Sequence, residues 1–280
     1  MLSPDHAHRS HLFAPASNEA LVDKALSSGA DAVVLDLEDA VTDLALAHRN
    51  LAAASDRFAE RPTHLRVGMG VDGYRTDDLD HLAGTALEAV RLPKVSDPEW
   101  VRGVSDHLDV AGARAAIHLT VESALGLARL TELVAVSNRI SRVVFGERDF
   151  LADLGVDEPG PLTDHARAGI AVMSRAHGLG TPIDGAYIDL EDDEGLRRSC
   201  ERALGFGFGG KSALHPRQLE VIHRVFSPSG EDQERAQEVV NAYEAARHRG
   251  EATTVVAGRF VDEAVARRAR SVLESAEEAR

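Results

Sequence analysis

Residues 32–37 read AVVLDL and decide the fold class that we expect for the chain. A short apolar run of this kind is typical of a β-strand covered on both faces, as in a parallel sheet. Helical patterns lie on either side of it, at about 17–28 and 44–58. This order predicts one unit of a parallel α/β sheet, with the acidic residues of 36–39 at the carboxyl end of its strand.

The same alternation continues in both directions along the chain. The predicted strands are 11–14, 32–37, 64–67, 89–93, 116–121, 142–145, 182–187 and 209–214. Further helices are predicted at about 97–108, 124–136, 163–177 and 192–204, and we expect each strand to be followed by a helix. Eight such units favour a closed (β/α)₈ TIM barrel, with an open doubly wound sheet as the alternative.

The end of the chain exceeds what a barrel needs. Two helical stretches, about 230–248 and 261–279, are joined by a segment rich in Gly, Thr and Val. We therefore expect two parts, a barrel over 1–226 and a C-terminal helical extension over 227–280. The extension is predicted to act as a lid and to contact a neighbouring subunit.

The composition excludes several classes of protein. The 280 residues carry a formal net charge of −15 and 4% aromatic residues, which argues against a nucleic-acid partner. No stretch approaches the roughly 20 apolar residues of a membrane helix, and the first residues lack a signal-peptide pattern, so we expect no membrane partner and a cytoplasmic location. The single cysteine, Cys200, excludes an internal disulfide framework and is predicted to be inert.

Polar residues gather where the predicted strands end, which is where barrel enzymes carry their active sites. They are Asp36, Glu38, Asp39, Arg66, Lys94, Glu122, Glu147, Asp149 and His215. Converging carboxylates repel one another unless a cation joins them, and oxygen ligands without paired histidines favour Mg²⁺, or Mn²⁺, over zinc. Glu122 and Asp149 follow adjacent strands and can share one ion. The alternative is that each acidic residue only caps the helix that follows it.

Arg66 lies inside a strand pattern, between Leu65 and Val67. A buried guanidinium needs an anionic partner, and its planar fork suits a carboxylate or an enolate. We therefore predict that Arg66 binds substrate. An ion pair with Asp36 or Glu38 is the alternative, and it is compatible with that role.

The remaining candidates favour structural roles. His118 is predicted to pack in the barrel interior. His6, His8 and His11 resemble a metal-binding cluster, but they stand apart from the carboxylates and are interpreted as surface or entry residues. The acidic run at 189–194 is interpreted as the solvated start of a helix.

Six segments together resemble the citrate lyase β-subunit and malyl-CoA lyase family of the HpcH/HpaI aldolase superfamily, in the family's order and over residues 9 to about 226. They are Arg9–Pro15 (RSHLFAP), Asp36–Val41 (DLEDAV), Leu92–Val95 (LPKV), Val121–Gly126 (VESALG), Phe145–Asp149 (FGERD) and Gly207–Pro216 (GFGGKSALHP). Each motif is weak alone, but six in register are specific. Two positions depart from the family pattern: Gly68 replaces a usual asparagine, and Gly209 replaces a frequent aspartate.

The resemblance implies a Mg²⁺-dependent barrel enzyme and a role for each matching residue. Glu122 and Asp149 would be metal ligands, and Glu122 would also lie near substrate. Arg66 would bind substrate and act in catalysis, assisted by Asp36, with Glu38 and Asp39 supporting the site. Asp262 would have an acid/base role in a neighbour's site, and Lys24 or Arg9 would bind a coenzyme A phosphate. A trimer or hexamer is expected.

The function that we expect is cleavage or formation of a 3-hydroxyacyl-CoA such as malyl-CoA, citramalyl-CoA or citryl-CoA, with an oxo-acid and an acyl-CoA as the other side of the reaction. Three alternatives remain open: an aldolase acting on free hydroxy or oxo acids, a lyase subunit that needs partner subunits, and a non-catalytic metabolite-binding protein. The replacement of the asparagine by Gly68 leaves the substrate undecided.

Overall fold

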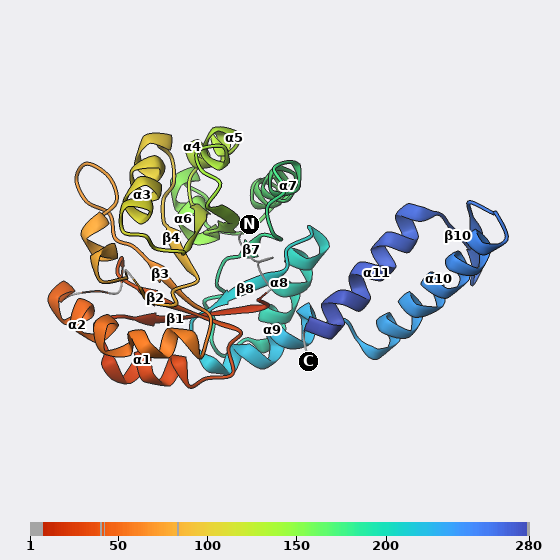
Figure 1. Cartoon of the computed structure of the whole chain (residues 1–280), viewed down its shortest axis with the longest axis horizontal. Coiled ribbons are helices and arrows are strands. Elements are labelled where there is room, and N and C mark those ends of the chain that lie inside the picture. Colours follow the sequence, from red (N-terminus) through yellow and green to blue (C-terminus); the bar gives the residue numbers. More distant parts are fainter. Residues whose placement is uncertain (1–7, 40, 42, 83, 279–280) are drawn as a thin grey trace. The chain divides into compact units, whose positions relative to one another are not determined.

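The computed structural model describes residues 8–39, 41, 43–82 and 84–278, and its central feature is a closed barrel of eight parallel strands in chain order (Figure 1). The strands are β1 Ser10–Pro15, β2 Ala32–Asp36, β3 Thr63–Arg66, β4 Ala89–Leu92, β5 Ala116–Val121, β6 Ile140–Phe145, β7 Ile183–Asp184 and β8 Gly210–Ala213. Pairing of β1 with β8, with Ser10 beside Lys211, closes the ring. The (β/α)₈ prediction is confirmed.

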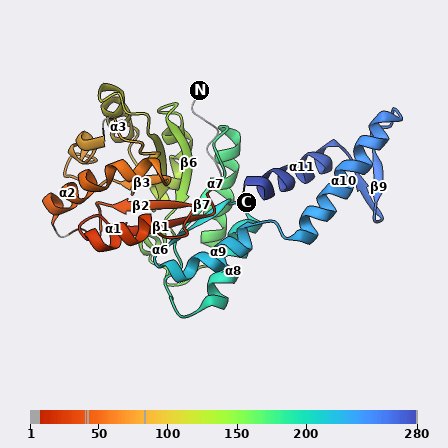
Figure 2. The ribbon, with the colours of Figure 1, turned by 60° about the horizontal axis from the view of Figure 1, so that its bottom comes forward.

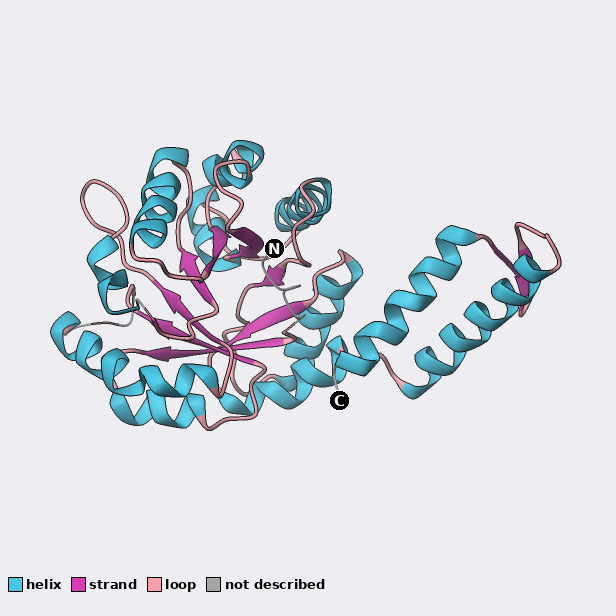
Figure 3. Cartoon of the chain, viewed as in Figure 1, coloured by secondary structure: helices cyan, strands magenta, loops and turns pink. Residues whose placement is uncertain are grey.

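The strands are buried because helices cover them on the outside and side chains fill the inside. All five residues of β2 are buried, and Figure 3 shows the magenta strands within an arc of cyan helices. The interior is unusually polar for a barrel of this class, where bulky aliphatic residues dominate. Its buried side chains include His11, His64, Arg91, His118 and Lys211.

Nine helices are described between β1 and the end of the barrel (Figure 2). They are α1 Glu19–Leu26, α2 Leu44–Ala54, α3 Pro98–Val110, α4 Ala124–Ala128, α5 Leu130–Val134, α6 Glu147–Leu154, α7 Pro161–Ala176, α8 Asp193–Gly205 and α9 Leu219–Phe226. Asn18, Asp43 and Asp97 start three of them by accepting a hydrogen bond from a backbone N–H of the first turn. In the part of the chain that the structure describes, no helix is both long and apolar enough to cross a membrane.

Several element boundaries differ from the prediction. The helix expected at 124–136 is two short helices that meet at Arg129, and the link from β3 to β4 contains only a 3₁₀ helix, Thr76–Leu82, among its described residues. The strand expected at 182–187 spans only Ile183–Asp184. Pro182 lacks the N–H that a strand needs, and a side chain at Gly185 would lie 2.8 Å from the Phe145 carbonyl oxygen. The acidic run at 189–194 does lie at the start of α8, as expected.

The C-terminal part, Arg224–Arg280, forms a compact unit of its own. Helices α10 Gly230–His248 and α11 Glu263–Glu278 lie side by side in Figures 1 and 2. Between them, β9 Thr254–Val256 and β10 Arg259–Val261 pair as a hairpin, which the sequence analysis missed.

The hairpin turn explains the Gly/Thr/Val-rich segment. Its two central residues, Ala257 and Gly258, have φ of 48° and 77°, as a tight primed turn requires. Tyr243, Val256 and Val261 form a small apolar core behind it. The unit boundary falls after His223 instead of 226, and the lid and subunit-contact roles stay predictions.

Candidate active site

Asp36 and Arg66 are the last residues of β2 and β3 and stand opposite each other in the sheet register. Nε of Arg66 donates to Oδ1 of Asp36 at 2.6 Å, and Nη2 donates to Oδ2 at 2.7 Å. The guanidinium also lies 5.2 Å from the ring centre of Phe13. The alternative that Arg66 forms an ion pair is therefore confirmed, and the pair fixes the orientation of its planar fork.

Glu38 lies between two cations at the mouth of the barrel. Its Oε2 is 2.9 Å from Nη1 of Arg66, and its Oε1 is 2.7 Å from Nζ of Lys94. Burial raises the pKa of Glu38 above its ordinary value, although Arg66 and Lys94 oppose the shift. Asp39 is more exposed and lies 3.4 Å from Nη2 of Arg66. Glu38 and Asp39 thus form ion pairs with Arg66 and Lys94.

Glu122 follows β5 and is 5% exposed. The backbone N–H of Lys94 donates to its Oε2 at 2.7 Å, and Lys94 has a φ of 49°, which is rare for a residue other than glycine. Ser123, not Glu122, caps α4. Burial, reinforced by the charge of Glu38, raises the pKa of Glu122 to about 8. This carboxylate therefore has no capping role and is costly to ionise without a nearby cation.

Gly146, directly after β6, makes the position of Glu122 possible. A Cβ at residue 146 would lie 2.2 Å from Cγ of Glu122 and 2.6 Å from its Oε1. Any side chain there would displace the carboxylate. The sequence analysis did not single out Gly146, although it is the glycine of the FGERD segment.

Asp149 lies in the first turn of α6 and is exposed. Its charge contributes to the raised pKa of Glu122, so the two carboxylates act on each other across the end of the barrel. Glu147 forms an ion pair with Arg167 instead, with its Oε1 2.8 Å from Nη2 of Arg167. His215 accepts a hydrogen bond from the N–H of Arg217 and begins a short 3₁₀ helix. Glu147 and His215 therefore have structural partners.

Glu147 belongs to a buried network of two acidic and two basic side chains, completed by Arg167, Asp184 and Lys211. Nε of Arg167 donates to Asp184 at 3.0 Å, and Nζ of Lys211 donates to the same carboxylate at 2.6 Å. Together, Arg167 and Lys211 offset Glu147 and Asp184. The sequence analysis missed this network because its members are far apart along the chain.

The carboxylates at the barrel mouth fit a divalent cation. Arg66 and Lys94 supply two positive charges, against five carboxylates: Asp36, Glu38, Asp39, Glu122 and Asp149. Glu122 and Asp149 offer hard oxygen atoms, and among the described residues the ion pairs of Arg66 and Lys94 are with Asp36, Glu38 and Asp39 instead. Mg²⁺ commonly takes one or two carboxylates and completes its shell with water and substrate oxygens. The donor set therefore matches Mg²⁺ or Mn²⁺.

Other side chains fill the space at both departures from the family pattern. A Cβ at Gly68 would lie 1.8 Å from Nη2 of Arg75, which donates to the Leu37 carbonyl at 2.6 Å. A Cβ at Gly209 would lie 2.1 Å from Oγ1 of Thr181. The sequence analysis named neither neighbour. Arg75 therefore brings a cation to the place where the family usually carries an amide.

Two of the predicted site residues, Arg9 and Lys24, do not belong to this group. Arg9 precedes β1, at the amino end of the barrel, and donates through Nε and Nη2 to Asp31 at 2.8 and 2.9 Å. Lys24 is exposed on α1. Asp262 belongs to the C-terminal unit, where its Oδ1 accepts the N–H of Val265 and caps α11.

The histidine interpretation needs a correction. His11 is 1% exposed and His8 is half-buried. Neither is a surface residue, because both side chains lie at the amino end of the barrel. His6 lies outside the described residues. His118 is buried, as predicted. Cys200 is also buried, and burial raises the pKa of its thiol to about 11, in keeping with the prediction of an inert residue.

Comparison with known proteins agrees with this geometry. A family model described as HpcH/HpaI aldolase/citrate lyase matches residues 9–216. The chain is 34% identical to an L-malyl-CoA/β-methylmalyl-CoA lyase of Cereibacter sphaeroides, over 98% of this chain and 96% of that protein. It is 35% identical to a (3S)-malyl-CoA thioesterase of the same organism, over 97% and 95%. Protein CitE of Mycobacterium tuberculosis, solved with magnesium, acetoacetate and coenzyme A, has a TM-score of 0.80 and 27% identity over 96% of this chain and 98% of that chain.

Proposed function

The chain belongs to the HpcH/HpaI aldolase/citrate lyase family, and on that basis we propose that it is a Mg²⁺-dependent carbon–carbon lyase acting on a 3-hydroxyacyl-coenzyme A. The observation that carries the proposal is Glu122, a buried carboxylate whose pKa is raised by burial and by the neighbouring charges of Glu38 and Asp149. The relatives named as a malyl-CoA lyase and as CitE with magnesium and coenzyme A support the metal and the substrate class.

Glu122 and Asp149 are the residues that would hold the cation, Mg²⁺ or Mn²⁺. When bound, this ion supplies a Lewis acid for the oxygens of the hydroxy acid. The backbone N–H of Lys94 and the close approach of Gly146 hold Glu122 in place. Because these contacts come from the ends of the two neighbouring strands, β4 and β6, the Glu122 carboxylate is oriented before substrate arrives.

Arg66 would bind the substrate carboxylate or the oxyanion that develops during cleavage. Its fork is fixed by Asp36 and Glu38, so little reorganisation is needed as negative charge builds up. Asp36 acts through Arg66 and is in this sense a positioning residue. Arg75 lies beside residue 68 at this end of the barrel, and its charge is paired with Asp78 at 3.3 Å.

For malyl-CoA, the bond that breaks joins the hydroxyl-bearing carbon to the CH₂ beside the thioester. The hydroxyl loses its proton and becomes the carbonyl of glyoxylate, while the CH₂ gains a proton and becomes the methyl of acetyl-CoA. We propose that Asp262 of a neighbouring subunit transfers the proton at that carbon, as the family resemblance implies. A group in this role typically contributes about 10²- to 10⁴-fold.

The structure gives no reason to assign Arg9 to coenzyme A, because Asp31 holds both ends of its guanidinium at the opposite end of the barrel. Lys24 remains a candidate for a coenzyme A phosphate on account of its exposure alone. A homo-oligomer follows from the role that we propose for Asp262, and the family resemblance implies a trimer or hexamer.

Thioester hydrolysis is the second candidate function, because one relative is named a (3S)-malyl-CoA thioesterase at 35% identity. The two reactions are separated by their products. Lyase action on malyl-CoA yields glyoxylate and acetyl-CoA, whereas hydrolysis yields malate and free coenzyme A. Free hydroxy acids in the same assay test the aldolase alternative, and absence of turnover with retained Mg²⁺ binding would favour a partner-dependent subunit or a binding protein.

The test is product analysis from malyl-CoA, citramalyl-CoA and citryl-CoA, each with Mg²⁺ and with EDTA. We expect oxo-acid and acyl-CoA in Mg²⁺ only, with loss of activity in Glu122→Gln. Asp262→Asn is preferable to Asp262→Ala, because asparagine keeps the cap of α11 while it removes the proton-transferring carboxylate. Equal activity of Glu122→Gln and the unmodified protein would contradict the metal-site assignment.

Mixing the two inactive proteins tests the subunit sharing. If Asp262 serves a neighbour's site, hybrid oligomers of Glu122→Gln and Asp262→Asn contain some complete sites and regain part of the activity. If each chain uses its own Asp262, mixing restores nothing. Light scattering on the same samples gives the oligomeric state.

A further inference from the structure

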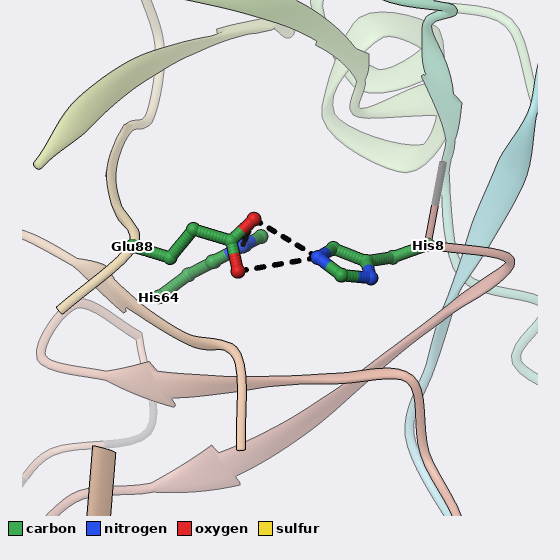
Figure 4. A group of neighbouring side chains, drawn as sticks. All are labelled: His8, His64 and Glu88. Carbon is green, nitrogen blue, oxygen red and sulfur yellow. Dashed lines mark hydrogen bonds and ion pairs between the residues drawn. The ribbon is translucent and has the colours of Figure 1, made fainter. Parts of the chain in front are cut away.

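Three metal-ligating side chains meet at the amino end of the barrel, away from the carboxylate site: His8, His64 and Glu88 (Figure 4). His8 lies two residues before β1, His64 is the second residue of β3, and Glu88 directly precedes β4. Arg66, at the opposite end of β3, belongs to the active site. The two groups are therefore at opposite ends of the same strands.

The ligand atoms converge closely enough for one ion. Nε2 of His8 is 2.9 Å from Oε1 of Glu88, and Nε2 of His64 is 3.7 Å from the same oxygen. All three ligand atoms lie within 4.8 Å of one another. Around a tetrahedral Zn²⁺ with bonds of about 2.0–2.1 Å, neighbouring ligand atoms stand roughly 3.3 Å apart. Small rotations of the side chains would thus bring them into a first coordination sphere.

The Nε2 atom of His64, which points toward Glu88, has no hydrogen-bond partner among the described residues. The His64 side chain is fully buried, and its Nε2 makes no hydrogen bond within normal distance, since 3.7 Å to Glu88 is too long. Burial lowers the pKa of His64 to about 3, so the ring is neutral at physiological pH, as a metal ligand must be.

The surrounding histidines hold the group in position. Nε2 of His11 lies 3.0 Å from the backbone carbonyl of His8 and anchors the segment that carries this ligand. His11, His64 and His118 come from β1, β3 and β5, and the ring centres of His64 and His118 are 4.8 Å apart. Alternate strands of a barrel supply one interior layer, so the rings of His11 and His118 pack against His64 within the barrel.

We propose that His8, His64 and Glu88 form a binding site for a borderline transition-metal ion of the Zn²⁺ type, distinct from the Mg²⁺ site. Two imidazoles and one carboxylate suit Zn²⁺ and leave a fourth position for water. His8 and Glu88 are partly exposed, with side-chain exposures of 11% and 29%, which gives the ion a route of entry. The bound ion would join the segment before β1 to β3 and β4.

The positive charge of Arg91 opposes the binding of a cation at this site. Nε of Arg91 donates to Nδ1 of His64 at 3.3 Å, on the side of the ring away from Glu88, so the neutral ring carries its proton on Nε2. Metal binding at Nε2 therefore requires the other tautomer, in which Nδ1 carries the proton and the hydrogen bond from Arg91 is lost. A cation at Nε2 would have to tolerate this neighbouring positive charge, and Glu88 is the group that offsets it. Loss of the Glu88 charge is therefore expected to weaken binding as strongly as loss of an imidazole.

Zinc titration of the full-length protein tests the proposal. The protein is stripped with EDTA, dialysed and saturated with Mg²⁺, and Zn²⁺ is then added against a chromophoric competitor. We expect one equivalent to bind, with the Kd raised at least about 10-fold in both His8→Ala and Glu88→Gln. His107→Ala is the matched control, since His107 pairs with Asp80 at 3.0 Å on the surface, and it should bind as the unmodified protein does.

Location and folding are checked separately. The anomalous signal at the zinc edge in crystals should lie among His8, His64 and Glu88, and Zn²⁺ should raise the Tm of the unmodified protein but not of His8→Ala. Glu88→Gln keeps the shape of the side chain, so it remains informative if His8→Ala proves unstable. Unchanged Zn²⁺ affinity in both variants, no stoichiometric binding, or a zinc peak at Glu122 and Asp149 would overturn the proposal. None of these outcomes bears on the lyase assay.

Discussion

At the scale of single residues, the site depends on side chains that occupy each other's space. Gly68 leaves room for Arg75, and Gly209 leaves room for Thr181. At each departure from the family pattern, the glycine and the side chain that fills its space therefore form a pair. A substitution at one member has to be judged with the other, because the cost of crowding depends on which neighbour can move.

Restoring the family's asparagine at residue 68 is expected to destabilise the protein. Gly68→Asn would push aside the Arg75 guanidinium and break its hydrogen bond to the Leu37 carbonyl, at a cost of about 1–3 kcal/mol. Arg75→Ala in the same chain should recover part of that loss. Urea unfolding of the two single variants and the double variant measures the coupling, and strictly additive effects would contradict it.

Arg66 offers a second prediction at this scale. Arg66→Lys keeps the charge but loses the fork that holds Asp36 through two hydrogen bonds. We expect kcat to fall by about 10²- to 10³-fold. Arg57→Lys, at a surface pair with Asp23, is the control and should leave kcat within error. A near-normal kcat in Arg66→Lys would mean that charge alone is sufficient.

At the scale of elements, residues at the ends of neighbouring strands hold one another in position. Glu122 after β5 is held by the N–H of Lys94 after β4 and lies against Gly146 after β6. Lys94 adopts a left-handed backbone conformation to make this contact. Sparsely populated conformations of this kind cost of order 1–3 kcal/mol and persist where the surrounding structure determines them.

Gly146→Ala is the sharpest test of this arrangement. The added methyl group would lie 2.2 Å from Cγ of Glu122, so the carboxylate must move and Mg²⁺ should bind at least about 10-fold more weakly. Gly103→Ala is the control, because residue 103 lies within α3 with no atom in contact range of a new Cβ. It should be stabilised by roughly 0.5–1 kcal/mol with normal Mg²⁺ affinity. Calorimetric Mg²⁺ titration compares the two, and equal affinities would contradict the expectation.

At the scale of the whole molecule, the raised pKa of Glu122 links stability to pH. Its pKa is about 8 in the folded chain against an ordinary value of 4.5. Between these values the folded state keeps a proton that the unfolded state has released. The free energy of unfolding in EDTA should therefore fall as pH rises through this range, by at most about 1.4 kcal/mol per pH unit.

Urea unfolding at several pH values checks this dependence. Glu122→Gln should remove the part of the slope that Glu122 contributes, and saturating Mg²⁺ should raise stability most at the alkaline end, because the ion binds the ionised carboxylate. The idea fails if the unmodified protein and Glu122→Gln show the same slope in EDTA.

The architecture was predictable from local patterns of the sequence, because the barrel repeats one strand-and-helix pattern. Each apolar run marks a strand, and the residue after it lies at the carboxyl end whatever the exact register, so the positions of Asp36, Arg66 and Glu122 were predictable. The hairpin at 254–261 and the split at Arg129 were not, because three-residue strands and one-turn helices leave too little periodicity to detect.

The contacts between side chains could not be predicted, because they depend on how the whole chain packs. The fit of Gly146 against Glu122, the Arg75 guanidinium beside Gly68, and the convergence of His8, His64 and Glu88 join residues up to 80 positions apart. His11 was interpreted as a surface or entry residue because the sequence does not indicate which face of the first strand points into the barrel. Contacts of this kind depend on barrel closure and strand stagger, and these follow from packing of the whole chain instead of any local segment.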